Sequence, residues 1–245
     1  MNIDFHTHTK LSKKRDFSLD YFHRMIAAAR KAGLHATALT EHFNTRNFHE
    51  IYDTLDRELP YRDHYYDVNG FRVFCGIEMD IREKGHILLI GERSEIRAIQ
   101  RTFQHRKDKN NFPSGQELFD EADNYNVVKI GAHPTRRSTP LTHLSPELLS
   151  RLDFLDLNGR ETATRKELEA FATKLNKPIV AGSDSHHPIQ FGAVFNTLRD
   201  DCRTIDDIRD CIQEGRYGIT VSPIVSLRVG AAKMIKRTIK LMGRA

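Results

Sequence analysis

The chain alternates short apolar segments with longer amphipathic ones, and this alternation constrains its fold more than any other feature. Apolar residues at helical spacing predict helices, and the short apolar runs between them predict strands. The expected strands cover residues 2–8, 35–40, 71–79, 86–91, 127–133, 151–159 and 177–185, and the expected helices cover residues 19–34, 48–59, 94–103, 115–126, 163–176 and 205–215. Strands that alternate with helices indicate a parallel sheet.

Polar side chains lie at the ends of many of these expected strands. A closed barrel gathers the carboxyl ends of all its strands at one rim, whereas an open doubly wound sheet spreads them along an edge. The chain has 245 residues, a length at which single α/β barrels are common. We therefore expect an α/β fold, a distorted TIM-like barrel in a single domain.

The first expected strand ends in two histidines one residue apart. Side chains two apart share a face of a strand, so His6 and His8 point the same way, and Asp4 on that face could orient them. Asp184 and His186 repeat this spacing near residue 185, and Glu78 ends an apolar strand. Imidazole nitrogens mixed with carboxylate oxygens suit zinc, manganese or iron, so we expect a metal site.

Several of these segments together resemble the PHP family, the polymerase and histidinol phosphatase phosphoesterases, over nearly the whole chain. The segments are "HTHT" from His6, "TEH" ending at His42, "GIE" ending at Glu78, "GHILLIG" containing His86, "GAHP" containing His133, and "GSDSH" ending at His186. The resemblance implies a barrel of seven β/α units, a distorted (β/α)7 fold. It also implies two or three divalent transition metal ions (Zn, Mn or Fe) at the carboxyl rim.

The resemblance also implies which residues hold each ion. The first ion would be held by His6, His8, Glu78 and Asp184. The second would be held by Glu78, His86 and His133, with Glu78 bridging the two ions, and a third ion would be held by His42 and His186.

The chain departs from the family pattern after its first motif. The family usually has an aspartate or histidine there, whereas Lys13 follows Ser12 in this sequence, and Asp16 is the nearest carboxylate. Either Asp16 replaces the missing ligand, or Lys13 occupies its space and the centre holds two ions.

Two divalent ions about 3.5–4 Å apart lower the pKa of a bridging water and neutralise charge on a leaving oxygen. We therefore expect a metal-dependent phosphatase that cleaves a small phosphomonoester, either histidinol-phosphate-like or nucleotide-derived. Attack by a metal-bridging hydroxide would invert the configuration at phosphorus without a phosphoenzyme. Glu78, Asp184 and His186 are the expected catalytic residues, and Arg136 and Arg160 are expected to bind the substrate phosphate.

Two other functions remain open. The same metal pair serves diesters, so the chain could be a phosphodiesterase or nuclease that acts on a nucleotide or nucleic acid. It could also be an inactive PHP module with a structural or interaction role. The tyrosine-rich residues 61–70 would offer aromatic surface that stacks on a substrate ring, although exposed tyrosines are common without such a role.

The excess of basic residues lies at the end of the chain. Residues 222–245 hold six basic residues and no acidic one, which leaves 32 basic against 33 acidic residues in the rest of the chain. Ile235, Ile239 and Met242 recur at helical spacing among these cations. We expect a barrel over residues 1–227 and a basic amphipathic helix over residues 228–245 that packs on it, with nucleic acid or anionic membrane contact as the alternatives.

The remaining features concern the cellular setting. Cys75, Cys202 and Cys211 are odd in number and have no C-x-x-C spacing, which favours reduced thiols in a cytoplasmic protein. The first residues lack the pattern of a signal peptide, and the chain has no apolar run near the length of a membrane span, so we expect no obligate membrane partner.

Overall fold

The structure is a computed structural model that describes residues 1–241, apart from the side chains of residues 236 and 239–241. Its strands are β1 (Asn2–Thr7), β2 (Ala36–Leu39), β3 (Tyr61–Arg62), β4 (Tyr65–Val68), β5 (Phe71–Asp80), β6 (His86–Gly91), β7 (Val128–Gly131), β8 (Phe154–Asn158), β9 (Ile179–Gly182), β10 (Val194–Leu198) and β11 (Tyr217–Val221). Its α-helices are α1 (Leu19–Lys31), α2 (Phe48–Glu58), α3 (Arg93–Phe103), α4 (Gly115–Ala122), α5 (Pro146–Ser150), α6 (Arg165–Leu175), α7 (Ile205–Gln213) and α8 (Val225–Leu241). Two 3-10 helices, η1 (Thr162–Thr164) and η2 (Pro188–Gln190), complete the described elements.

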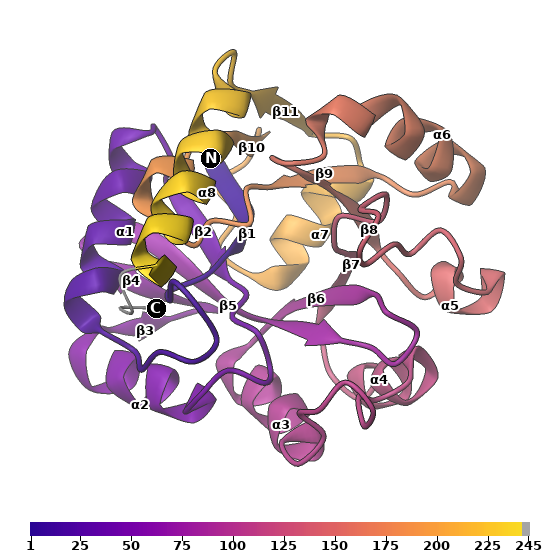
Figure 1. Cartoon of the computed structure of the whole chain (residues 1–245), viewed down its shortest axis with the longest axis horizontal. Coiled ribbons are helices and arrows are strands. Elements are labelled where there is room, and N and C mark those ends of the chain that lie inside the picture. Colours follow the sequence, from indigo (N-terminus) through magenta and orange to yellow (C-terminus); the bar gives the residue numbers. More distant parts are fainter. Residues whose placement is uncertain (242–245) are drawn as a thin grey trace.

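The strands form one nearly closed barrel with helices around its outside (Figure 1). Its wall follows the order β1-β2-β5-β6-β7-β8-β9, which confirms the expected distorted barrel of seven strands in one domain. The hairpin of β10 and β11 extends the sheet beyond β1, and β3 and β4 form a second hairpin on β5. The sequence patterns did not predict either hairpin.

The barrel closes between β1 and β9 through a buried side-chain amide. Asn196 on β10 donates to the carbonyls of Ile3, at 3.2 Å, and of Ala181, at 2.8 Å, and accepts from the amide of Ala181 at 2.8 Å. The side chain therefore acts as an extra peptide unit that continues the sheet hydrogen bonding across the gap. At the rim, the amide of His8 donates to the carbonyl of Ser185 at 2.8 Å and completes the closure.

Strand β6 runs in the opposite direction to the strands beside it. It pairs antiparallel with β5 and with β7, whereas the β1–β2, β2–β5, β7–β8 and β8–β9 pairs are parallel. The expectation of a wholly parallel sheet was therefore wrong at this strand. Because β6 is reversed, its first residue, His86, pairs with Asp80 at the end of β5 and lies at the same rim as the other strand ends.

Apolar side chains fill the space below that rim. Residues two apart on a strand share a face, so Phe74 lies on the face of Glu78, and Phe154 on the face of Asp156. Phe74 and Phe154 belong to one buried cluster with residues from β6, β7 and β9, and Ile205 and Ile208 of α7 pack against it. A larger cluster packs the outer faces of the strands against helices α1 to α4 and α6. The polar site therefore rests on a rigid apolar base.

The tyrosine-rich hairpin does not offer the aromatic surface that the sequence suggested. Tyr65 and Tyr66 on β4 are buried, and the Tyr66 hydroxyl donates to Asp56 on α2 at 2.6 Å. Strand β4 pairs with the beginning of β5, Phe71 to Phe74, whereas the polar rim lies at the other end of β5. These rings therefore pack in the core, away from the rim.

The last helix, α8, begins at Val225, three residues before the predicted start. Its first half packs on the barrel, because Val225 and Ala232 are buried and the Arg228 guanidinium donates to the carbonyls of Ile189, at 3.3 Å, and Phe191, at 2.6 Å. The predicted contacts of Ile239 and Met242 and the charge of Arg244 lie outside the described residues. The division of the chain at residue 227 stays a prediction. None of the described helices is long and apolar enough to cross a membrane.

Candidate metal centre

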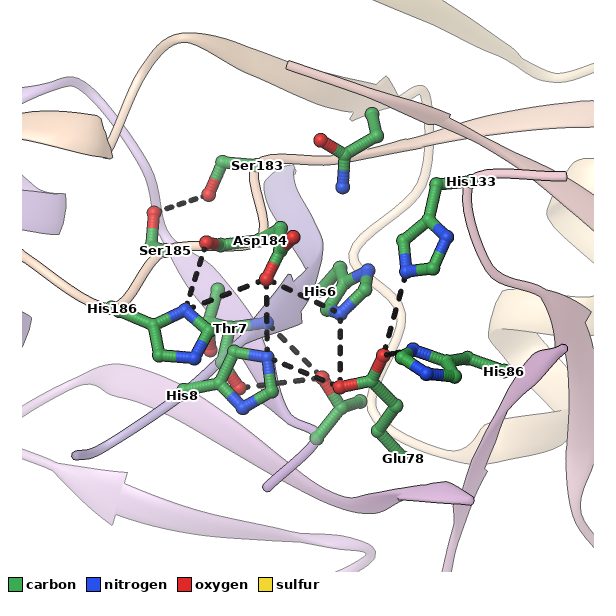
Figure 2. Close-up of polar contacts among 12 residues, drawn as sticks. His6, Thr7, His8, Glu78, His86, His133, Ser183, Asp184, Ser185 and His186 are labelled. Atoms are coloured by element: carbon green, nitrogen blue, oxygen red, sulfur yellow. Dashed lines mark hydrogen bonds and ion pairs between the residues drawn. The ribbon is translucent and has the colours of Figure 1, made fainter. Parts of the chain in front are cut away.

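Eight polar side chains that the sequence picks out from six segments meet at the rim of the barrel. Figure 2 labels all of them except His42. Ligand atoms of three such residues lie within 4.8 Å of one another in each of four groups. The groups are His6, His8 and Glu78; His6, His133 and Asp184; Glu78, His86 and His133; and His8, His42 and His186. The structure therefore brings together all the predicted ligands except Asp16, whose place is described below.

Glu78, at the end of β5, lies at the centre of the cluster, and its two carboxylate oxygens face different histidines. The Oε2 atom lies 3.4 Å from Nε2 of His8 and 3.7 Å from Nε2 of His6. The Oε1 atom lies 2.6 Å from Nδ1 of His86 and 3.5 Å from Nε2 of His133. One carboxylate thus connects two separate groups of nitrogen atoms, which is the arrangement that a bridging ligand requires.

Asp184, just past β9, approaches the same cluster from the opposite wall. Its Oδ1 lies 3.4 Å from Nε2 of His8 and 3.9 Å from Nε2 of His6, and Nδ1 of His186 is 3.4 Å away. Asp184 and His133 have backbone φ angles of 54° and 35°, in the left-handed region that side chains other than glycine seldom adopt. Such backbone strain persists only where the surroundings impose it, and it is concentrated at functional sites.

Several buried polar atoms of the cluster make no hydrogen bond. These atoms include Nε2 of His6, of His8 and of His133. Buried polar atoms in native proteins almost always have a partner, and each exception calls for an explanation. Because these atoms converge on a common space, a divalent cation bound by them is the partner that the donor set fits.

The pKa shifts of the two carboxylates also agree with a cation site. Burial disfavours ionisation of Glu78, but the surrounding imidazoles of His42, His86 and His6 outweigh it and hold its pKa well below the usual range. Burial likewise opposes ionisation of Asp184, yet His8, His6, His186 and Arg136 lower its pKa. Burial lowers the pKa of His133 to about 3, which keeps its imidazole neutral. The two carboxylates and His133 are therefore in the protonation states that bind metals, whereas the neighbouring carboxylates raise the pKa values of His6, His8 and His86 despite their burial.

Three further carboxylates support the clustered histidines from behind. The sequence reasoning named Glu41 only as part of the "TEH" segment and did not single out Asp80 or Asp156. Oδ2 of Asp156 on β8 lies 3.1 Å from Nδ1 of His6, Oε1 of Glu41 lies 3.6 Å from Nδ1 of His8, and Oδ1 of Asp80 lies 3.0 Å from Nε2 of His86. A carboxylate behind a ligating histidine fixes the orientation of the ring and raises its basicity. The inward position of Asp156 in the strand sequence "FLDLN" was the available signal.

Asp4 has a different role from the one expected. Its Oδ1 accepts hydrogen bonds from the backbone amides of His6, at 3.1 Å, and Ser183, at 2.9 Å, and its Oδ2 accepts from the Ser183 hydroxyl at 2.5 Å. Asp4 therefore holds the backbone of two rim segments together, while Asp156 contacts the His6 ring.

Asp16 does not reach the centre. Its carboxylate is 61% exposed and lies 3.8 Å from Nη1 of Arg46. Lys13 instead extends to the rim, where its Nζ donates to Oδ2 of Asp80 at 3.0 Å. Of the two alternatives for this loop, the structure therefore agrees with the one in which Asp16 supplies no ligand.

The two predicted phosphate-binding arginines differ in their surroundings. Arg136 is largely buried, and its guanidinium donates to both carboxylate oxygens of Glu161 and, at 3.0 Å, to Oδ2 of Asp184. These two acids neutralise the Arg136 guanidinium, and Glu161 holds it beside Asp184. Arg160 is exposed at the end of β8 and lines a cavity of about 460 Å³ that it shares with His186. Only Arg160 is therefore accessible to an anionic ligand without breaking an ion pair.

Comparisons with known proteins agree with this fold. Residues 165–217 match the family model described as PHP-associated. The structure is similar to PsfC from Pseudomonas syringae PB-5123, with a TM-score of 0.81 and 19% sequence identity over 97% of this chain and 98% of that one. A comparison with the curated proteins finds no match.

Two other solved structures share the architecture. The lesion-specific endonuclease PfuEndoQ from Pyrococcus furiosus matches 89% of this chain with a TM-score of 0.67 and 21% identity, and the match covers 57% of the endonuclease. A protein from Bifidobacterium adolescentis ATCC 15703 that is assigned as a metal-dependent phosphoesterase matches 86% of this chain and 95% of its own, with a TM-score of 0.53 and 16% identity. At these identities the likeness concerns the fold.

Proposed function

We infer, from the premise that this chain is a PHP-family protein, that it is a metal-dependent hydrolase of phosphate esters. The observation that carries this inference is the position of Glu78, whose two carboxylate oxygens face two separate sets of histidine nitrogens. A shared carboxylate between two cation positions is typical of two-metal phosphoesterase centres.

The residues at the rim divide into two sets of ligands around this carboxylate. His6, His8, Glu78 and Asp184 would hold one divalent ion, and Glu78, His86 and His133 would hold the other. The mixture of imidazole and carboxylate favours zinc, manganese or iron over magnesium or calcium. When bound, such ions supply Lewis acidity and a water molecule of lowered pKa.

We propose that the resident centre holds two ions. A third position would have His42 and His186 together with His8, which already belongs to the first set. The carboxylate that could complete this position, Asp16, is paired with Arg46 on the surface. In addition, the loop brings the Lys13 ammonium rather than a carboxylate to the rim, where it pairs with Asp80.

The side chains around the two sets position the ligands and the substrate. Arg136 keeps the Asp184 carboxylate oriented through its contact with Oδ2. His186 belongs both to the cluster and to the lining of the cavity, so it would contact the substrate where the two meet. Arg160 would bind an anionic group of the substrate on that side. Glu78, Asp184 and His186 are accordingly the proposed catalytic residues.

A small phosphomonoester is the substrate we propose, because the cavity beside the cluster has the size of a small-molecule site. Its volume of about 460 Å³ lies within the range of small-molecule sites. The likeness to endonuclease Q supports a phosphodiester substrate as the second candidate, since the same fold there serves a lesion-specific endonuclease.

We also propose a cytoplasmic location, because all three cysteines are free and buried.

Hydrolysis of p-nitrophenyl phosphate and of bis(p-nitrophenyl) phosphate, with manganese or zinc added, distinguishes these candidates. We expect faster turnover of the monoester, and a loss of at least a thousandfold in Glu78→Ala. Glu147→Ala is the matched control, because Glu147 is exposed at the beginning of α5. Preference for the diester would favour the second candidate. Metal binding without turnover of either ester would favour an inactive module.

A further inference from the structure

A cavity opens beside the metal cluster, between the barrel rim and α8. It is lined by Leu11, Arg160, His186, His187, Gln190, Val229, Ala232 and Lys233, and we call it the α8 cleft. His186 is the one lining residue that also belongs to the clusters of candidate ligands. A phosphate ester with its phosphoryl group at the cluster would therefore place the rest of the molecule in this cleft.

We propose that the α8 cleft binds the leaving-group part of the substrate, and that Lys233 on α8 recognises a second anionic group there. This inference rests on the proposed function, because it assumes that the phosphoryl group lies at the metal cluster. It adds a substrate class: phosphate esters whose leaving group carries a carboxylate or a further phosphate.

The charge of the cleft supports an anionic occupant. Its lining has two permanent cations, Arg160 and Lys233, and no acidic residue. In the part of the chain that the structure describes, neither of these side chains forms an ion pair, whereas Arg136 nearby is neutralised by Glu161 and Asp184. Burying an anion between unpaired cations and a metal cluster is favourable, because no carboxylate of the protein competes for them.

The shape of the cleft indicates how the anion would be held. Leu11, Val229 and Ala232 supply apolar surface to the lining that also holds His186 and Lys233. Ala232 and Lys233 follow Val229 by three and four residues, so all three lie on one side of α8. A substrate with a compact apolar body and an anion away from its phosphoryl group would match this combination of surfaces.

The helix that carries Lys233 is fixed in place. The Arg228 guanidinium donates to the carbonyls of Ile189 and Phe191, which flank the end of η2, and Ala232 is buried against the barrel. The backbone position of Lys233 is therefore defined relative to His186, although its side chain reaches into solvent. A defined position allows a single lysine to discriminate between substrates.

Two esters that differ by a single carboxylate test this proposal: phenyl phosphate and 4-carboxyphenyl phosphate. We expect wild-type protein loaded with manganese to have the higher kcat/KM for the carboxylated ester. We expect Lys233→Met, which keeps most of the unbranched stem but removes the charge, to reduce that preference about fivefold, the scale of one partly exposed ion pair. Lys174→Met, on the exposed side of α6, should leave the preference unchanged.

Equilibrium binding supplies a measurement that does not depend on turnover. Isothermal titration calorimetry with phenylphosphonate and 4-carboxyphenylphosphonate, which cannot be hydrolysed at an ester bond, should show the same preference and the same loss in Lys233→Met. Equal affinity of the wild type for the two phosphonates, or a preference retained in Lys233→Met, would overturn the proposal. Failure to hydrolyse either ester while the binding preference persists would instead count against the proposed function and leave the α8 cleft supported.

Discussion

The Nδ1 atom of His6 lies 3.1 Å from Oδ2 of Asp156, although the two residues are 150 positions apart in the chain. Both side chains are fully buried. The contact directs the other nitrogen of the His6 ring, Nε2, toward Glu78 and Asp184. The orientation of a residue on the first strand is thus set by a carboxylate on β8, on another part of the barrel wall.

Replacing Asp156 with asparagine should weaken metal binding without unfolding the protein. Asparagine keeps the shape of the side chain but removes the charge that favours the ligating state of His6. Loss of such a supporting carboxylate typically costs about 10- to 100-fold in metal affinity. Competition with a chromogenic chelator measures this change, and Asp210→Asn, at an exposed position on α7, is the control. An unchanged affinity would mean that Asp156 does not support the centre.

Gly182→Ala should destabilise the barrel where it closes. An alanine Cβ at this position would lie 2.3 Å from Cβ of His6 and 2.8 Å from Oδ1 of Asp156, so β1 or β9 must move. Such overpacking costs about 1–3 kcal/mol in the free energy of unfolding. Gly230→Ala, in α8 with open space around it, should instead be neutral or stabilise by up to about 1 kcal/mol. Urea denaturation followed by tyrosine fluorescence compares the two, and equal stabilities would contradict the close approach of the strands.

Asn196→Ala tests the closure itself. The substitution leaves the buried carbonyls of Ile3 and Ala181 and the amide of Ala181 without a partner. Unsatisfied buried groups cost about 1–3 kcal/mol, so we expect a loss in this range from urea denaturation. Asn110→Ala, in the exposed loop before α4, should change the free energy of unfolding by less than about 0.5 kcal/mol. A loss no greater than that of this control would show that the barrel does not depend on the amide.

Much of this architecture was predictable from the sequence, because polar residues at the ends of apolar strands can be recognised one by one. The reversed β6 could have been recognised as well: only residues 81–85 link β5 to β6, and a parallel connection needs a dozen or more residues. Asp156 was visible as an inward-facing acid on an apolar strand. The place of Asp16 was not predictable, because it depends on the path of an irregular loop.

The first turn of α4 should give the protein a local dependence on pH. The Arg106 side chain, together with the backbone and hydroxyl of Ser114, lowers the pKa of Glu117 to about 2. A lowered pKa means that the contribution to stability is present above the unfolded pKa, about 4.3, and is lost as the pH falls toward 2.

Glu117→Gln should therefore lower the free energy of unfolding near neutral pH, by no more than about 1 kcal/mol because Glu117 is half exposed and solvent screens it. The difference from wild type, measured by urea denaturation of chelator-treated protein, should shrink between pH 4.3 and 2. A difference that stays constant over this range would rule out the charged form of Glu117 as its source.

The number of ions bound through Glu78 tests the central claim most directly. Inductively coupled plasma mass spectrometry of protein dialysed against manganese or zinc should give two ions per chain. Because Glu78 belongs to both ligand sets, Glu78→Ala should bind fewer than one ion per chain, whereas Glu147→Ala should keep both ions. Two ions retained by Glu78→Ala, or none bound by the wild-type chain, would contradict the account.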